Sequence, residues 1–212
     1  MSNFLKNIEK LNKALNTKKL PGKKVQYQMA PPGRPQEYPK HNSFKQAAVT
    51  LFLYNKKNEI YFPLIQRTEY NFNDKHKGQI SLPGGKLDES DQDLYYCALR
   101  ELEEELGIKQ HKIKPVGSLS ELFIPVSNFK VHPYVVYSDK NINFVPQPSE
   151  VQYIIEVPLK NLLDNNKIKT GKIILENGME LNDIPYFYLN NHVVWGATAM
   201  ILNEFKNVII NY

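Results

Sequence analysis

The chain has 212 residues, of which 42% are hydrophobic and 23% charged, and this length and composition predict a folded protein with one main domain. The longest apolar stretch, AAVTLFLY at residues 47–54, is far shorter than the ~20 residues that cross a bilayer, so we expect no membrane segment. The single Cys97 excludes an internal disulfide and a cysteine-based zinc site, and it fits a reducing cytoplasm.

The net charge of +5 suits an anionic partner, but the lysines are scattered among Asn and Glu instead of forming a block. Two interpretations follow from this pattern. The protein binds a small molecule that bears phosphate, or the lysines form an ordinary solvated surface. Both disfavour nucleic acid as the partner.

Apolar residues near the N-terminus recur at helical spacing and predict an amphipathic helix that packs on the body or on a second subunit of a homodimer: Phe4, Leu5, Ile8, Leu11 and Leu15. Residues 21–39 contain five prolines and two glycines, which predict a connector without regular structure. We therefore divide the chain into an N-terminal helix with its Pro-rich connector, residues 1–42, and a main domain, residues 43–212.

From residue 46 the pattern changes to short runs of β-branched and aromatic residues. Strands are predicted at residues 47–54, 59–67, 113–119, 131–137, 151–157, 169–175 and 186–189, and the first two are expected to be antiparallel neighbours. Helices are predicted at residues 93–106, closed by Gly107, and at residues 193–205. This order predicts an α/β fold, a mixed-sheet sandwich with a helix on each side.

Three acids share one face of the predicted helix at residues 93–106, because Glu101, Glu104 and Glu105 are spaced i, i+3, i+4. Glu103 points elsewhere and is expected to be solvated. The adjoining apolar stripe predicts that the three acids lie at the edge of the core: Leu94, Ala98, Leu102 and Leu106.

Like charges at this spacing destabilise a helix by ~0.2–0.5 kcal/mol per pair, and partial burial adds to the cost. Arg100 can neutralise Glu104, and a divalent ion with oxygen ligands, Mg²⁺ or Mn²⁺, can accept several carboxylates. The alternative is an exposed acidic surface without a ligand. The turn at Gly84 and Gly85 favours the ion, because glycines let backbone and phosphate approach closely at the entrance to a helix.

These residues resemble the signature of the Nudix hydrolases, GGx5Ex7REUxEExGU, where U is aliphatic. The second half matches position by position: Arg100, Glu101, Leu102, Glu104, Glu105, Gly107 and Ile108. In the first half, Asp91 takes the place of the usual Glu, and eight residues instead of seven separate it from Arg100. The resemblance implies the Nudix fold, a mixed β-sheet in an α/β/α sandwich, here with an N-terminal helical extension.

The loop is similar to that of the coenzyme A diphosphatase branch, which carries GGxxDxxD, here Gly84, Gly85, Asp88 and Asp91. The stretches LIQRT, GQISLPGG, PSEVQYIIEVPL and VWGATAMIL also resemble this branch, so the similarity covers residues 45–205. The branch pattern LLTxR[SA]x3Rx3Gx3FPGG is kept in part. Three departures concern substrate identity: Thr68 replaces a small residue, Leu82 replaces Phe, and the loop between residues 68 and 78 is two residues longer and lacks the second Arg.

The resemblance implies a role for each helix residue. Glu101 and Glu105 are the strongest metal ligands, Glu104 is the next, the carbonyl near Gly85 completes the coordination, and Arg100 orients the glutamates. Family members often draw one more catalytic group from a loop outside the signature. Here Glu150 is the candidate general base or additional ligand, with a surface glutamate as the alternative.

Substrate contacts are expected from the turn, at Gly84, Gly85 and Lys86, and from two basic residues. Arg67 follows a predicted strand and suits a phosphate, or it pairs with an acid. His76, with Lys75 or Lys77, is a candidate to replace the missing second Arg, or it is an exposed bystander.

Three functions are compatible with these patterns. The first is a Mg²⁺- or Mn²⁺-dependent hydrolase that cleaves the diphosphate of coenzyme A or acyl-CoA to 3′,5′-ADP and (acyl) 4′-phosphopantetheine. The second keeps the chemistry but acts on ADP-ribose, dinucleotides or another nucleoside diphosphate derivative. The third is a non-catalytic nucleotide- or RNA-binding module, against which the intact set of acids argues.

Overall fold

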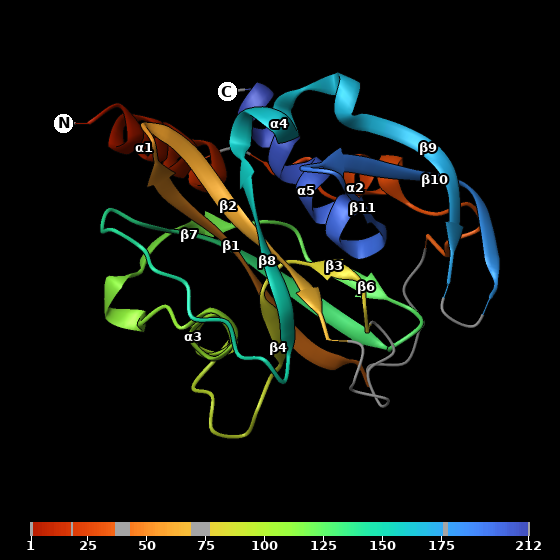
Figure 1. Cartoon of the computed structure of the whole chain (residues 1–212), viewed down its shortest axis with the longest axis horizontal. Coiled ribbons are helices and arrows are strands. Elements are labelled where there is room, and N and C mark those ends of the chain that lie inside the picture. The colour runs from red at the N-terminus through yellow and green to blue at the C-terminus, as the bar shows by residue number, and fades with distance from the viewer. Residues whose placement is uncertain (1, 18, 37–42, 69–76, 176–177, 212) are drawn as a thin grey trace.

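The computed structural model describes residues 2–17, 19–36, 43–68, 77–175 and 178–211 (Figure 1). Its helices and helical turns are α1 (Asn3–Thr17), α2 (Lys23–Gln26), η1 (Tyr27–Met29), α3 (Leu94–Leu106), η2 (Gln110–Lys112), α4 (Leu159–Leu163), η3 (Asn165–Lys167) and α5 (Gly196–Ile210). Its strands are β1 (Lys45–Lys56), β2 (Glu59–Arg67), β3 (Ile80–Ser81), β4 (Gly84–Lys86), β5 (Lys114–Ser118), β6 (Leu122–Ile124), β7 (Phe129–Ser138), β8 (Val151–Pro158), β9 (Ile168–Ile174), β10 (Glu180–Leu189) and β11 (His192–Trp195).

Eight strands form one mixed sheet with the path β3-β2-β1-β7-β5, while β4 pairs with β1, β6 with β7 and β8 with β2. The pair β1–β7 is parallel, and β1–β2 is antiparallel as predicted. A second sheet of three strands, β11-β10-β9, was not expected from the sequence. The mixed-sheet α/β/α prediction is confirmed.

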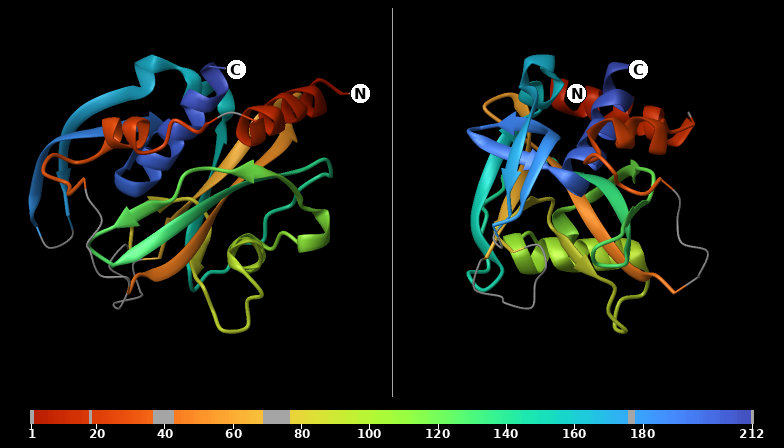
Figure 2. Two further views of the ribbon diagram at one scale, coloured as in Figure 1. Left: turned by 180° about the vertical axis from the view of Figure 1, so that it is seen from behind. Right: turned by 90° about the vertical axis from the view of Figure 1, so that its right-hand side faces the viewer.

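Helices cover both faces of the large sheet (Figure 2). On one face, Leu102 and Leu106 of α3 pack with Phe52 and Ile65 of the sheet. The other face carries the larger core cluster, to which α1 and α5 both contribute. The two faces therefore have separate cores, and α3 packs on the face opposite α1 and α5.

Local signals fix both ends of α3. The Asp93 carboxylate accepts a hydrogen bond from the backbone N–H of Tyr96 at 2.9 Å, as an N-cap does. Gly107 adopts the left-handed conformation at φ 71°, and its N–H bonds the carbonyl of Glu103 at 2.8 Å. The predicted bounds of this helix are confirmed.

The N-terminal helix packs on the body of the same chain. The side chains of Asn12 and Asn16 donate to the carbonyl of Val116 on β5, at 2.7 and 2.8 Å. A Cβ at Gly117 would lie 2.8 Å from the Cβ of Leu15, so α1 sits very close to this strand. Residues on both sides of the predicted boundary at residue 42 thus share one core, and the homodimer stays a prediction.

Two predicted elements were wrong in part. The connector at residues 21–39 contains α2 and η1, because residues 23–29 hold no proline or glycine. The helix predicted at residues 193–205 begins at Gly196 and runs to Ile210. Val193 and Trp195 belong to β11 and pair with β10, since β-branched and aromatic residues suit a strand, and Gly196 at φ 64° turns the chain into the helix.

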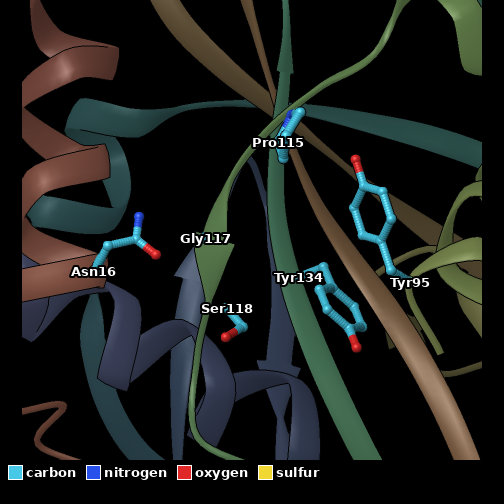
Figure 3. A pocket seen from close by; sticks show the side chains of 6 residues that line it. All are labelled: Asn16, Tyr95, Pro115, Gly117, Ser118 and Tyr134. Carbon is cyan, nitrogen blue, oxygen red and sulfur yellow. The ribbon is translucent and has the colours of Figure 1, made fainter. Parts of the chain in front are cut away.

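A shallow pocket of about 270 Å³ lies at the β5 edge of the large sheet (Figure 3). It is lined by Asn16, Tyr95, Pro115, Gly117, Ser118 and Tyr134. None of the predicted site residues lines it. Among the described residues, no helix has both the length and the apolar character needed to cross a lipid bilayer.

Candidate functional site

The glycine turn is a short strand. Gly84 and Gly85 of β4 pair with Val49 and Ala48 of β1. A Cβ at Gly84 would overlap the carbonyl of Ala48, and one at Gly85 would overlap the carboxylate of Glu101. Glycine is therefore required at Gly84, where the β1 backbone leaves no room, whereas a side chain at Gly85 would displace the Glu101 carboxylate from its place against this turn.

Glu105 is the most deeply buried acid of α3, with 1% of its surface exposed. Its Oε2 accepts a hydrogen bond from the N–H of Gly84 at 2.8 Å, and Nη1 of Arg67 lies 3.6 Å from its Oε1. Burial raises the pKa of Glu105 to about 8, against the opposing effect of Arg67. A carboxyl with so high a pKa needs additional positive charge to be ionised at neutral pH.

Three carboxylates meet at this point. Glu101, Glu105 and Glu150 each place a carboxylate oxygen within 4.8 Å of the other two. Glu150 comes from the loop before β8, where its carbonyl accepts the N–H of Thr68 at 2.9 Å. The register of β2 and β8 shifts between Gln66 and Arg67, and this irregularity lies beside Glu150. Burial also raises the pKa of Glu101.

Arg100 holds three acids in place and makes four hydrogen bonds to their carboxylates. Its Nε and Nη2 each bond one oxygen of Asp91 at 2.9 Å, in a two-pronged contact. Nη1 donates to Glu101 at 2.9 Å and to Glu104 at 2.8 Å, and Nη2 also reaches the carbonyl of Lys86 at 3.2 Å. The guanidinium is thus a fixed part of the site.

Asp91, which stands where the family signature has Glu, is the buried partner of Arg100. Its side chain is 3% exposed, and the hydrogen bonds from Arg100 lower its pKa to about 2. Its Oδ2 also accepts the N–H of Asp88, which closes the loop on itself. An acid therefore still reaches Arg100, although one more residue than in the family signature separates it from Arg100.

Glu104 and Glu103 lie outside the cluster of three. The side chain of Glu104 is 50% exposed and is held by Arg100. Glu103, expected to be merely solvated, pairs with Lys109 at 2.8 Å and accepts the N–H of Gln110 at 3.3 Å. Glu103 thus points away from the cluster as expected, and it gains these two donors because the chain turns back after Gly107.

The remaining predicted contacts are placed as follows. Arg67 pairs with an acid, which was one of its two predicted roles. The side chain of Lys86 is exposed at the end of β4. His76 and Lys75 lie outside the described residues. Cys97 is buried beneath the turn, with Sγ 3.8 Å from the carbonyl of Gly85, and burial raises its thiol pKa to about 12.

The donor set suits a hard divalent cation. Carboxylate and carbonyl oxygens are the ligands that Mg²⁺ and Mn²⁺ prefer, and three carboxylates converge within 4.8 Å beside the glycine turn. Like charges at this separation repel, and a cation offsets that repulsion. The site is therefore one at which carboxylates can bring a metal ion and a phosphate-bearing ligand together.

Comparisons with known proteins agree with this class. Residues 44–176 match the NUDIX domain family. Two relatives named uncharacterized Nudix hydrolase NudL, from Yersinia pestis and Yersinia pseudotuberculosis, are 35% identical over 131 residues, or 61% of this chain. The match spans 64% of their length, less than two thirds. The chain belongs to the NUDIX domain family.

Solved structures show the same fold. A MutT/nudix family protein from Enterococcus faecalis has a TM-score of 0.51 at 16% identity, over 96% of this chain and 74% of that one. A MutT protein from Methanosarcina mazei Go1 has a TM-score of 0.50 at 19% identity, over 82% of this chain and 97% of that one. The first of these alignments extends beyond the family match, over nearly the whole chain.

Proposed function

We propose that this protein is a hydrolase that requires Mg²⁺ or Mn²⁺ and cleaves the diphosphate of coenzyme A or acyl-CoA. The products are 3′,5′-ADP and (acyl) 4′-phosphopantetheine. The observation that carries the proposal is the convergence of Glu101, Glu105 and Glu150 within 4.8 Å beside the glycine turn. The single buried cysteine is compatible with the cytoplasm as the place of this activity.

Glu101, Glu105 and the carbonyl of Gly85 would hold the ion, with Glu104 and Glu150 at its periphery. A bound divalent ion would neutralise charge on the diphosphate oxygens and make water more acidic. Glu150 is the member of the cluster that comes from a loop, and we propose that it acts as the general base that accepts a proton from the attacking water. Arg100 keeps Glu101 and Glu104 oriented, and Arg67 is close enough to Glu105 to reach a phosphate bound there.

Coenzyme A is favoured over other diphosphates by the loop after the glycine turn. Its two aspartates have distinct structural tasks: Asp88 accepts hydrogen bonds from the N–H and hydroxyl of Ser90, and Asp91 holds Arg100. The loop that resembles the coenzyme A branch is therefore ordered by the residues that define the resemblance.

A second candidate substrate is ADP-ribose or another nucleoside diphosphate derivative. Leu82, which stands where the branch pattern has Phe, is 3% exposed and belongs to the core. Its smaller side chain changes the packing directly before the turn, at a position that the branch pattern restricts. This difference favours a substrate range wider than coenzyme A.

A substrate panel separates the two candidates. Purified full-length protein with Mg²⁺ or Mn²⁺ is incubated with coenzyme A, dephospho-coenzyme A, ADP-ribose and diadenosine diphosphate, and products are resolved by chromatography. We expect 3′,5′-ADP from coenzyme A and a preference for it over the dephospho form. Faster cleavage of ADP-ribose than of coenzyme A would make ADP-ribose the preferred substrate. The absence of metal-dependent cleavage of every compound in the panel would reject the proposal that the protein is a hydrolase.

A further inference from the structure

Ser81 carries a buried hydroxyl that has no hydrogen-bond partner among the described residues. It lies on β3, the two-residue strand that pairs with the end of β2 and leads into the glycine turn (Figure 1). Buried side-chain oxygens in folded proteins nearly always have a partner, which is protein, water or a ligand. An unpaired hydroxyl three residues before Gly84 therefore requires an explanation.

The strand register shows which face Ser81 belongs to. Ser81 is opposite Ile65, and directly opposed residues of an antiparallel pair lie on the same face of the sheet. Ile65 packs with Leu102 and Leu106 of α3. Ser81 therefore lies on the face that α3 covers, the face that carries the carboxylate cluster.

Arg67 is the next residue of β2 on that face, two positions after Ile65. Its N–H bonds the carbonyl of Gln79, which extends the β2–β3 ladder, and its guanidinium lies 3.6 Å from Glu105. Ser81 is thus a diagonal neighbour of Arg67. The strand register thus places Ser81 next to the residue of this face that contacts Glu105.

We propose, on the basis of the proposed function, that the Ser81 hydroxyl donates a hydrogen bond to a non-bridging oxygen of the substrate diphosphate, next to Arg67. A neutral donor is suited to this place because another cation would repel the metal ion and Arg67. Without substrate the hydroxyl is buried and unpaired, which costs stability. With substrate it completes a contact to a charged oxygen, and such contacts are among the stronger hydrogen bonds.

The test uses Ser81→Ala and the non-hydrolysable probe α,β-methylene ADP in saturating Mn²⁺. We expect the Kd of the probe to rise about 10- to 100-fold, as for a lost hydrogen bond to a charged group. The affinity for Mn²⁺ alone should not change. The melting temperature should rise by about 2–4 °C, because an unpaired buried hydroxyl has been removed.

Ser138→Ala is the matched control. Ser138 is fully buried at the end of β7, and its hydroxyl oxygen accepts the N–H of Lys140 at 3.2 Å. It pairs with Tyr54, at the end of β1 away from the glycine turn. This variant should lower the melting temperature and leave the Kd of the probe unchanged, so the two serines should have opposite effects on stability.

Two outcomes would overturn the proposal. A Ser81→Ala variant that is more stable but binds the probe like wild type makes the hydroxyl a bystander. A variant that is less stable and binds Mn²⁺ more weakly would show that the Ser81 hydroxyl bonds a buried water or contacts the ion instead of the substrate. Wild-type protein that binds the probe but cleaves no diphosphate would reject the proposed function. The Ser81 contact would then still be judged by the difference in probe Kd between wild type and Ser81→Ala.

Discussion

The two faces of the large sheet each carry a buried glutamate on a covering helix, Glu105 on α3 and Glu204 on α5. Both are almost inaccessible to solvent, and burial raises the pKa of both. Both also accept a hydrogen bond from the backbone N–H of a glycine, Gly84 for Glu105 and Gly22 for Glu204. They are alike in burial and in the direction in which burial shifts their pKa.

Their other neighbours differ. Glu204 also accepts the side-chain amide of Gln26 at 2.9 Å and the N–H of Ser120 at 3.2 Å, so neutral donors from two distant segments satisfy it. Glu105 lies within 4.8 Å of two further carboxylates. Burial of a glutamate therefore does not by itself indicate function. Crowding by like charge is the feature that supports the proposed ion site, because neutral donors complete a structural anchor, whereas carboxylates this close together repel one another unless positive charge offsets them.

The largest loss of activity is expected when the buried glutamate of α3 is changed. Glu105→Gln keeps an oxygen for the N–H of Gly84 but removes the charge that would hold the ion. We expect kcat/KM for the preferred diphosphate to fall by at least about 10³-fold, with a melting temperature equal to or above that of wild type. Steady-state kinetics and thermal unfolding check this, and activity near the wild-type level would refute the site.

The corresponding change on the α5 side should affect stability instead. Glu204→Ala leaves the donors of Gly22, Gln26 and Ser120 buried without an acceptor, which should cost about 3 kcal/mol of unfolding free energy. Urea denaturation measures this loss. The kcat/KM of the folded variant should stay within about twofold of wild type, and a large loss of turnover in folded protein would show that the two faces are coupled.

Asp91→Asn tests the support of the α3 site, because Asp91 holds the guanidinium of Arg100, which in turn bonds Glu101 and Glu104. We expect a loss of about 2 kcal/mol in stability at neutral pH. The pKa of Asp91 is about 2 in the fold and about 3.9 in an unfolded chain, so its contribution is complete above about pH 4 and is lost as the pH falls through 2. Denaturation at pH 2–7 should show a weaker acid dependence for the variant, and an unchanged dependence would contradict the pairing.

The smallest expected effect concerns Glu104, whose side chain is half exposed and lies outside the cluster of three. Glu104→Gln should cost about 0.5–1 kcal/mol in stability, as for an exposed ion pair. Its kcat/KM should fall by about tenfold, less than for Glu105→Gln. Equal losses in the two variants, measured with the same substrate, would make Glu104 a full member of the ion site.

Local patterns predicted the parts of the fold that depend on neighbours in the chain. Asp93 and Gly107 marked the ends of α3, and short runs of β-branched and aromatic residues marked β1 and β2, because caps and strand preference act within a few residues. The same spacing placed Glu101 and Glu105 close together. The start of α5 was misplaced, since the strand character of Val193 is realised only by pairing with β10.

The sequence by itself determined the acidic helix, the glycine turn and the family to which they point, because these features are carried by residues close together in the chain. Three features appear only in the folded chain: Glu150 joins the cluster, Asp91 still reaches Arg100 across a longer loop, and the buried Ser81 hydroxyl has no partner in the part of the chain that the structure describes. The physical reason is that such contacts depend on strand register and on how a helix docks against a sheet, and no short-range pattern specifies either.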